Sequence, residues 1–183
     1  MKQLVLIRHG QSLWNAENKF TGWVDSPLSQ RGIQEAIKAG KLIKEFDLDI
    51  QIAFTSFLSR AINTLNILLK EINKSNLTVN KTWNLNERHY GSLTGLNKEE
   101  TKKEIGESLF LKYRRSWETA PPPIKENDKN ILQYGSLNKT IPKDKIPCTE
   151  SLKDTYNRVI KYYKSDIIDN LSNYNAIIIA AHG

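Results

Sequence analysis

The chain has 183 residues, 39% of them apolar and 26% charged, which is most simply one soluble globular domain that can bury a core. No apolar run approaches the roughly 20 residues that a membrane span needs, and the first residues lack the layout of a signal peptide. The net charge of +7 is compatible with nucleic acid, an anionic surface or an anionic substrate, but the lysines are scattered, which argues against a nucleic-acid binder.

Strands and helices alternate along the first part of the chain. A strand is expected over 3–8, and its apolar run LVLI indicates burial on both faces. The turn SPLSQRG at 26–32 leads into a helix that continues to about Phe46. Helical spacing assigns the buried side of this helix to Ile33, Ile37, Gly40 and Ile43.

A second strand, helix and strand follow. DIQIAFTS at 49–56 predicts the strand, and SFLSRAINTLNILLKEI at 56–72 predicts an amphipathic helix. A short strand is expected near 78–82. The core stripe of the helix is expected to be Leu58, Ile62, Leu65 and Leu69.

Residues 84–147 have a different character. The polar stretch LNERHYGSLTGLNKEET leads into a helix near 97–106, and a further helical stretch contains YRRSW at 113–117. PPP at 121–123 ends helical structure. We expect a lid-like irregular excursion near 107–148, because a long irregular segment inside a compact domain is more often functional than a linker.

The last predicted elements are a helix from Thr149 to about Leu171 and the strand NAIIIAA at 175–181. The single cysteine, Cys148, excludes an internal disulfide, favours a reducing compartment and is expected to be structural. The order of strands and helices predicts an α/β fold with a mostly parallel sheet. The buried stripe of the last helix is expected to be Leu152, Tyr156, Val159, Tyr163 and Ile167.

Two of the three histidines directly follow apolar strands, in RHG at 8–10 and in AAHG at 180–183. Ligands of open α/β sheets bind beyond the carboxyl ends of parallel strands, so we expect both imidazoles at one edge of the sheet. Gly10 and Gly183 would let a ligand approach the backbone. The alternative is two unrelated loop histidines, which the matched endings disfavour.

The residues near these histidines favour a phosphate over a metal ion. No two histidines have a local ligand spacing, and no cysteine or carboxylate cluster accompanies them. Their neighbours are arginines, which grip phosphate through paired hydrogen bonds and keep a nearby imidazole neutral and nucleophilic. We therefore predict a histidine that carries a phosphoryl group covalently, without a metal. The arginines are Arg8, Arg60, Arg88, Arg114 and Arg115.

A general acid is needed to protonate the leaving oxygen in such a reaction. Glu87, in the loop LNERHYG, is the candidate. The alternative is that Glu87 only pairs with Arg88 at the surface.

Several motifs together resemble the cofactor-dependent phosphoglycerate mutases of the histidine phosphatase superfamily. The opening LVLIRHGQSLWNAENKFTGWVDSPLSQRG is similar to that of this family almost word for word, and FTSFLSRAINT resembles its second signature. LNERHYGSLTGLNKEET resembles the segment that separates these mutases from simple phosphatases. YRRSW, PPP, CTESL and IIIAAHG follow in the order of the family, so the resemblance covers 1–183.

The resemblance implies a three-layer fold, with a mostly parallel central sheet and helices on both faces, in a single domain over 1–183. It makes His9 the nucleophile that becomes phosphohistidine and Glu87 the proton donor and acceptor. Arg8, Arg60 and His182 would surround the transferring phosphoryl group.

The resemblance also implies a set of substrate-binding residues, in which His89 is not expected to react. The residues that would hold the substrate carboxylate and second phosphate are Arg88, Tyr90, Lys98, Arg114 and Arg115. The remaining members of the set are Arg8, His9, Gly10, Gln11, Ser12, Leu13, Trp14, Asn15, Thr21, Gly22, Arg60, Glu87, His89 and Gly183.

The activity implied by the resemblance is the interconversion of 3-phosphoglycerate and 2-phosphoglycerate in glycolysis and gluconeogenesis. This is an isomerase reaction, an intramolecular phosphotransfer that is primed by 2,3-bisphosphoglycerate and uses no metal. The expected partners are small-molecule phosphoglycerates, not nucleic acid or a membrane. The enzyme would be a cytoplasmic homodimer or homotetramer.

Members of this family continue beyond the last His-Gly with NSL, another helix, a closing strand and a tail. We therefore expect that the family's C-terminal part is missing after Gly183. Three other functions stay open: a phosphatase of the same superfamily, a truncated non-catalytic remnant that binds anions or a partner, and a basic nucleic-acid binder.

Overall fold

A computed structural model describes residues 2–125 and 141–183 of the chain. The chain forms two compact units, each described here by itself. The first unit comprises Met1–Ser12, Pro27–Asn86 and Val159–Gly183, and the second comprises Leu13–Ser26 and Glu87–Arg158. The organisation of 1–183 as one domain stays a prediction.

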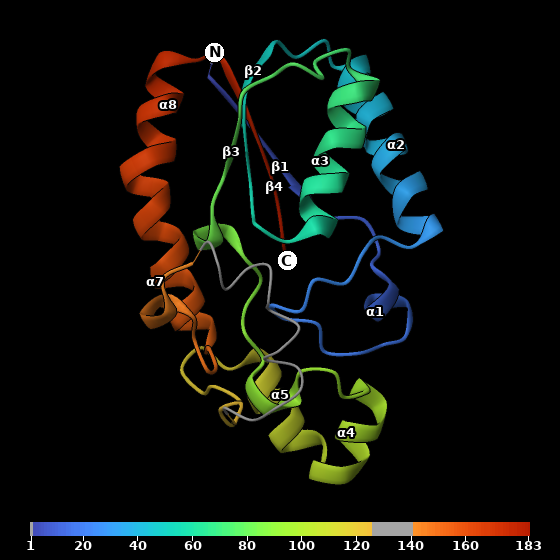
Figure 1. The fold of residues 1–183 in the computed structure, drawn as a ribbon, viewed down its shortest axis with the longest axis vertical. Coiled ribbons are helices and arrows are strands. Elements are labelled where there is room, and N and C mark those ends of the chain that lie inside the picture. The colour runs from blue at the N-terminus through green and yellow to red at the C-terminus, as the bar shows by residue number, and fades with distance from the viewer. Residues whose placement is uncertain (1, 126–140) are drawn as a thin grey trace. The chain divides into compact units, whose positions relative to one another are not determined.

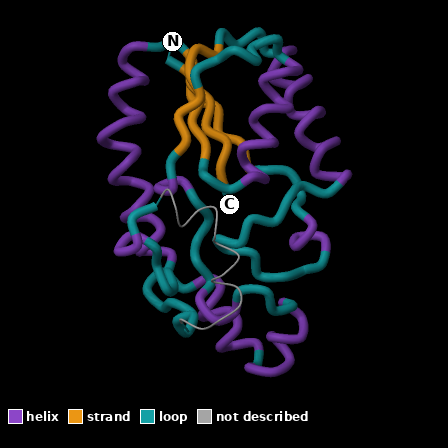
Figure 2. The backbone as a smooth tube through the Cα atoms, in the orientation of Figure 1, coloured by secondary structure: helices purple, strands orange, loops and turns teal. Residues whose placement is uncertain are grey.

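The first unit contains a parallel sheet of four described strands in the order β1-β4-β2-β3 (Figure 2). One of its two inner strands, β4, is the run AIIIAA, whose first five residues are buried. Each buried isoleucine side chain contributes roughly 1.5–3 kcal/mol. The mostly parallel sheet that was predicted is confirmed. The strands are β1 Gln3–Arg8, β2 Ile50–Thr55, β3 Val79–Lys81 and β4 Ala176–Ala181.

Helices α2 (Gln30–Glu45) and α3 (Ser59–Glu71) lie side by side on one face of this sheet (Figure 1). The buried side of α2 differs from the prediction, since Ile33 and Ile37 are only half-buried. A Cβ atom on Gly40 would lie 2.6 Å from Cβ of Glu71, so small side chains let the two helices approach closely. The buried residues of α2 are Gly32, Ala36, Gly40 and Ile43.

In α3 the predicted stripe is confirmed at three of its four positions, and Ile62 is half-buried. Arg60 and Thr64 are buried in the same helix. The core that α2 and α3 share with the sheet contains Ile43, Ile50, Ala53, Leu65, Leu68, Leu69, Ala176, Ile178 and Ala180.

The opposite face of the sheet is covered by the last part of α7 (Leu152–Tyr162), a π-helical turn at Tyr163–Ile167 and α8 (Ile168–Asn173). Together they place a helical layer on each side of the sheet, as Figure 1 shows for α8 and α3. The buried residues of this second core are Ile52, Phe54, Leu85, Ile167, Ile177 and Ile179.

The predicted stripe of the last helix is correct only in its second half. Val159, Tyr163 and Ile167 pack on the sheet. Tyr156 is instead 51% exposed, and its ring packs against Trp117, with ring centroids 5.4 Å apart. The reason is that Leu152–Arg158 belongs to the second unit, so the helix changes its packing partner along its length.

Strand β1 is an edge strand of the described sheet, not a central one as its apolar run suggested. Its only described partner is β4, with Leu6 opposite Ile179 and Arg8 opposite Ala181. Val5 and Ile7 pack toward α2 and α3, whereas Leu6 is 68% exposed. The prediction that β1 is buried on both faces is therefore wrong.

The second unit is built from short helices around Phe20, Leu93 and Phe110. Asn97 caps the first of its longer helices by accepting the amide of Glu99 at 2.9 Å. The elements of this unit are α1 Leu13–Ala16, the 3₁₀ turns Gly91–Leu93 and Lys143–Lys145, α4 Lys98–Ile105, α5 Glu107–Arg115 and the start of α7. A further 3₁₀ turn, Trp83–Leu85, belongs to the first unit.

The helix expected near 97–106 is confirmed as α4, and the helical stretch expected around YRRSW ends at Arg115, before Ser116 and Trp117. Of the lid-like excursion near 107–148, residues 126–140 lie outside the described residues, and its role as a lid stays a prediction. In the two described ranges, no helix is both long and apolar enough to cross a membrane.

Candidate functional site

His9 and His182 lie together at the carboxyl ends of β1 and β4. The two strands are parallel neighbours, and the amide of His9 donates to the carbonyl of Ala181 at 3.0 Å. The ring centroids of the two histidines are 4.9 Å apart, at an interplanar angle of 59°. The expectation that both imidazoles lie at one edge of the sheet is therefore met.

The local geometry fixes which nitrogen of His9 carries the proton. Nδ1 lies 2.6 Å from the carbonyl oxygen of Gly10, which can only accept a hydrogen bond. Nδ1 is therefore the protonated nitrogen of the neutral ring, and Nε2 keeps its lone pair. Burial, followed by the positive charges of Arg60 and Arg8, lowers the pKa of His9 from 6.5 to about 3. The imidazole is neutral at physiological pH, as a nitrogen nucleophile must be.

Arg60 is buried in the first turn of α3, near enough for its charge to act on His9. One turn later, Thr64 donates its hydroxyl to the carbonyl of Arg60 at 2.7 Å and accepts the amide of Gly10 at 3.1 Å. A Cβ atom on Gly10 would collide with the carbonyl of Gly32. Glycine is therefore required here because the backbone runs against the start of α2.

Ser56 is a residue of this site that the sequence reasoning missed. Its Oγ lies 2.9 Å from Nε2 of His182, and it accepts the amide of Leu58 at 3.2 Å. Ser56 is buried and directly follows the carboxyl end of β2. The rule that selected His9 and His182 from strand ends would also have selected Ser56.

Other predicted site residues of the first unit have structural partners. The side-chain oxygen of Gln11 accepts the hydroxyl of Ser29 at 2.9 Å. The main-chain N–H of Gln11 donates to the carboxylate of Glu35 at 2.9 Å, so Gln11 holds the start of α2. Ser12 is buried and forms a bridge with Leu28. Arg8 is exposed, and its side chain lies beside Gly183, since a Cβ atom there would be 2.9 Å from Cδ of Arg8.

The second unit contains the other predicted cations, beginning with Arg88. This arginine is 5% exposed, and its Nη2 donates to the carbonyls of Tyr113 and Arg114 at 3.1 Å each. Its guanidinium lies 4.7 Å from the ring centroid of Tyr90. Nε and Nη1 of Arg88 are buried and have no hydrogen-bond partner among the described residues. These two donors are what an oxyanion would satisfy.

Further cations surround the aromatic core of this unit. Nζ of Lys98 lies 5.7 Å from the ring centroid of Phe20, and the guanidinium of Arg114 lies 5.7 Å from that of Phe110. The phenol of Tyr90 has a raised pKa because of burial and the charge of Glu87. Of the remaining predicted residues in the second unit, Thr21 and Gly22 are buried, Trp14 and Asn15 are half-buried, and Leu13 and Arg115 are exposed.

Glu87 begins the second unit, directly after Asn86 of the first. Its side chain is half-buried, and its main-chain carbonyl accepts the indole N–H of Trp23 at 2.7 Å. Asn86 is itself fixed in the first unit, where its Oδ1 accepts the amide of Phe57 at 3.0 Å. Within the second unit, the main chain of the candidate proton donor is therefore fixed at its carbonyl.

His89 is fully buried. The amide of Gly91 donates to its Nδ1 at 3.0 Å, so the neutral ring carries its proton on Nε2. Burial and the positive charge of Arg158 lower the pKa of His89 from 6.5 to about 4. The ring stays uncharged inside the folded protein.

We expect His89 to make the fold sensitive to acid. Its folded pKa lies below its unfolded pKa, so the unfolded chain binds more protons between about pH 6.5 and about pH 4, and stability falls as pH drops through that window. The contribution lost between about pH 7 and about pH 5 is about 2 kcal/mol. Urea unfolding of the wild type and of His89→Gln measures it.

The buried His9 also has a lowered pKa, so both the wild type and His89→Gln lose stability as the pH falls. The wild type should lose more, because it contains both buried histidines. The difference in unfolding free energy between the two proteins should become constant above about pH 7 and change only below it. Parallel curves from neutral to acidic pH would contradict the assignment of a buried neutral His89.

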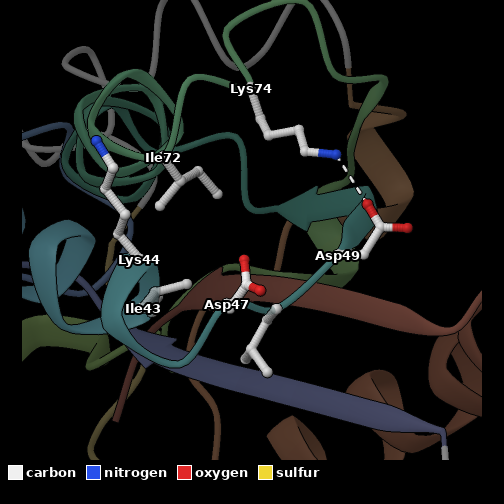
Figure 3. Close-up of a pocket in the computed structure, with 7 residues that line it drawn as sticks. Ile43, Lys44, Asp47, Asp49, Ile72 and Lys74 are labelled. Carbon is white, nitrogen blue, oxygen red and sulfur yellow. Dashed lines mark hydrogen bonds and ion pairs between the residues drawn. The ribbon is translucent and has the colours of Figure 1, made fainter.

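A separate pocket of about 320 Å³ lies at the amino end of β2 (Figure 3). Because the described strands are all parallel, this is the edge of the sheet opposite to His9 and His182. Nζ of Lys74 and Oδ1 of Asp49 form an ion pair at 2.9 Å in its wall. Its lining has no histidine and no arginine, so we assign the chemistry to the other edge. The lining residues are Ile43, Lys44, Asp47, Leu48, Asp49, Ile72 and Lys74.

The sequence matches known proteins over its whole length. The model of the histidine phosphatase superfamily (branch 1) matches residues 4–133. Proteins named 2,3-bisphosphoglycerate-dependent phosphoglycerate mutase from Parabacteroides distasonis, Borreliella afzelii and Pelagibacter ubique are 45%, 50% and 50% identical. All 183 residues are covered in each match, and they span 74% of the first two relatives and 76% of the third.

Solved structures share the fold. A phosphoglycerate mutase from Bacillus anthracis has a TM-score of 0.73 at 20% identity, with 100% of this chain and 75% of the other covered. A mycobacterial glucosyl-3-phosphoglycerate phosphatase has a TM-score of 0.71 at 22% identity, with 100% and 77% covered. The predicted phosphoglycerate mutase-like fold is confirmed.

The family model and the relatives agree with the strand-end histidines in the described structure. The chain belongs to the histidine phosphatase superfamily, branch 1, and within it to the family of the 2,3-bisphosphoglycerate-dependent phosphoglycerate mutases.

Proposed function

We propose that this protein interconverts 3-phosphoglycerate and 2-phosphoglycerate through a phosphohistidine at His9. The observation that carries the proposal is a buried, neutral His9 whose Nδ1 is engaged by Gly10 and whose Nε2 is available, beside His182. Relatives 45–50% identical are named for this activity, which belongs to glycolysis and gluconeogenesis. The enzyme is an isomerase.

Nε2 of His9 attacks the phosphorus, forming a P–N bond while the bond from phosphorus to the substrate oxygen breaks. Glu87 gives its proton to that leaving oxygen. In the second half, Glu87 takes the proton of the hydroxyl that attacks the phosphohistidine, and the P–N bond breaks. Arg8, Arg60 and His182 offset the negative charge on the transferring group. The two halves together move a phosphoryl group between the 2- and 3-hydroxyl positions of phosphoglycerate, and neither half uses a metal ion.

The primer, 2,3-bisphosphoglycerate, supplies the first phosphoryl group to His9. The cations of the second unit suit the rest of such a ligand, since Nε and Nη1 of Arg88 are buried donors without a partner among the described residues. Tyr90, Lys98, Arg114 and Arg115 are proposed to bind the carboxylate and second phosphate with it. A guanidinium with free donors is the group that pairs best with such oxyanions.

The test compares isomerisation with phosphate release. Purified protein, charged with 2,3-bisphosphoglycerate, is given 3-phosphoglycerate, and both 2-phosphoglycerate and inorganic phosphate are measured. We expect isomerisation to exceed phosphate release. Release without isomerisation would replace the proposal with a phosphatase of the same superfamily, and the absence of both would favour a non-catalytic remnant. The cytoplasmic location and the assembly as a homodimer or homotetramer stay predictions.

A further inference from the structure

The second unit contains a buried ion pair between Glu150 and Arg158. The side chains are 5% and 8% exposed. Nε of Arg158 donates to Oε1 of Glu150 at 2.8 Å, and Nη2 donates to Oε2 at 2.9 Å. The pair is thus bidentate, which fixes the plane of the guanidinium relative to the carboxylate.

Both partners also bind the main chain of Glu87–His89. Oε2 of Glu150 accepts the amide of His89 at 2.8 Å, and the amide of Glu150 donates to the carbonyl of His89 at 2.9 Å. Nη2 of Arg158 lies 3.4 Å from the carbonyl of Glu87. The ion pair therefore holds this tripeptide at both of its ends.

Trp23 completes the arrangement. Its indole N–H donates to the same carbonyl of Glu87 at 2.7 Å, and the guanidinium of Arg158 lies 5.6 Å from the centroid of its ring. Trp23 is 1% exposed. The carbonyl of Glu87 is thus fixed from two directions by groups that also contact each other.

Stability alone does not account for this ion pair. Removing two charges from water costs about as much as their attraction returns, so a buried pair is a weak stabilising element. What the pair does supply is direction, because both partners also form hydrogen bonds with the main chain of one tripeptide. That tripeptide carries Glu87, the proposed proton donor, and Arg88, with its unpartnered buried donors.

We propose that Glu150 and Arg158 are positioning residues for Glu87. They hold the backbone of Glu87 so that its carboxyl group delivers a proton to the leaving oxygen. This inference rests on the proposed function, in which Glu87 is the proton donor. If it is right, loss of the ion pair slows the protonation of the leaving oxygen by Glu87 but does not slow the attack of His9 on phosphorus.

The test compares two phosphoryl donors to the same His9. Transfer from 2,3-bisphosphoglycerate breaks a P–O bond to an alkoxide, which needs a proton, whereas 2,4-dinitrophenyl phosphate releases a phenolate that needs none. In Arg158→Gln, we expect the rate of His9 labelling from bisphosphoglycerate to fall about 100-fold, and the first-turnover burst of dinitrophenolate to fall less than about 5-fold. Arg158→Lys keeps the charge but not the bidentate geometry. Its rate of His9 labelling from bisphosphoglycerate should lie between the rates of Arg158→Gln and the wild type.

The control is Lys153→Gln. Lys153 lies on the same helix and pairs with Glu118 at 2.8 Å, but the two side chains are 49% and 70% exposed. Exposed pairs contribute little, so both labelling rates should equal those of the wild type. Equal losses from both donors in the Arg158 variants would overturn the positioning role, because a general structural defect would impair both.

A second readout does not depend on turnover. The indole N–H of Trp23 reports the position of the Glu87 carbonyl, and Trp23→Phe assigns its signal in a ¹H–¹⁵N spectrum. We expect this signal to shift in Arg158→Lys and to stay in place in Lys153→Gln. An unchanged Trp23 signal in Arg158→Lys would overturn the proposal, whatever the wild type catalyses. If the Trp23 signal shifts in Arg158→Lys as expected but His9 of the wild type is not labelled, the proposed function is refuted instead.

Discussion

Replacing His9 with alanine is expected to abolish acid-labile phosphate labelling from 2,3-bisphosphoglycerate and to lower isomerisation by at least about 10⁴-fold. The reason is that Nε2 is the nitrogen of His9 with an available lone pair, since Nδ1 donates its proton to the carbonyl of Gly10. Labelling with ³²P, quenched in base to preserve the P–N bond, measures the effect.

The location of the label can be read directly. Trypsin separates the three histidines, because His9 lies in peptide 9–19, His89 in 89–98 and His182 in 165–183. We expect phosphate on 9–19 alone. His89→Gln, which removes a buried histidine from the second unit, should keep this label. A label that persists in His9→Ala, or that maps to 165–183, would remove His9 from the role of nucleophile.

The sequence predicted the site at the strand ends because the rule behind it is local. An apolar strand with His-Gly at its end identifies both the strand and the edge at which its polar residues gather. His9 and His182 are 173 positions apart, yet parallel pairing of β1 and β4 places their ring centroids 4.9 Å apart. Their proximity therefore required two expectations, that the sheet is parallel and that the two strands are neighbours in it.

Packing partners were harder to predict, because they depend on which elements meet. The run LVLI in β1 reads like a central strand, but strand order is a property of the whole sheet, and Leu6 is exposed at the edge. In α2 the contact with α3 favours the small Gly40, whereas Ile33 and Ile37 stay half-buried. Tyr156 fits the stripe of its helix but packs on Trp117 within the second unit and not on the sheet.

The residues that support Glu87 could not have been found from spacing. Glu150 precedes α7 and Arg158 lies in it, eight residues later. This spacing alone does not indicate a contact between the two side chains. Their meaning comes from hydrogen bonds to Glu87 and His89, more than 60 positions earlier. A buried ion pair of this kind is visible only when the charge partners and the bound backbone are seen together.

Glu87→Gln is the prediction that tests the chemistry most sharply. The amide is close in size to the carboxyl group but has no proton to give at neutral pH, so we expect isomerisation to slow by about 10²–10⁴-fold. Binding of 3-phosphoglycerate should change less than about 3-fold, because the cations proposed to hold it are untouched. Steady-state kinetics and equilibrium titration measure the two effects separately.

The same variant separates a proton donor from a surface partner of Arg88. With 2,4-dinitrophenyl phosphate the leaving group needs no proton, so the first-turnover burst in Glu87→Gln should stay within about 5-fold of the wild type. If Glu87 only paired with Arg88, the substitution would weaken binding of 3-phosphoglycerate and leave the bound reaction fast. Unchanged turnover in Glu87→Gln would therefore return Glu87 to a structural role. It would also leave the backbone contacts of Glu150 and Arg158 without a catalytic purpose, since those contacts matter to the reaction only through the carboxyl group that they orient.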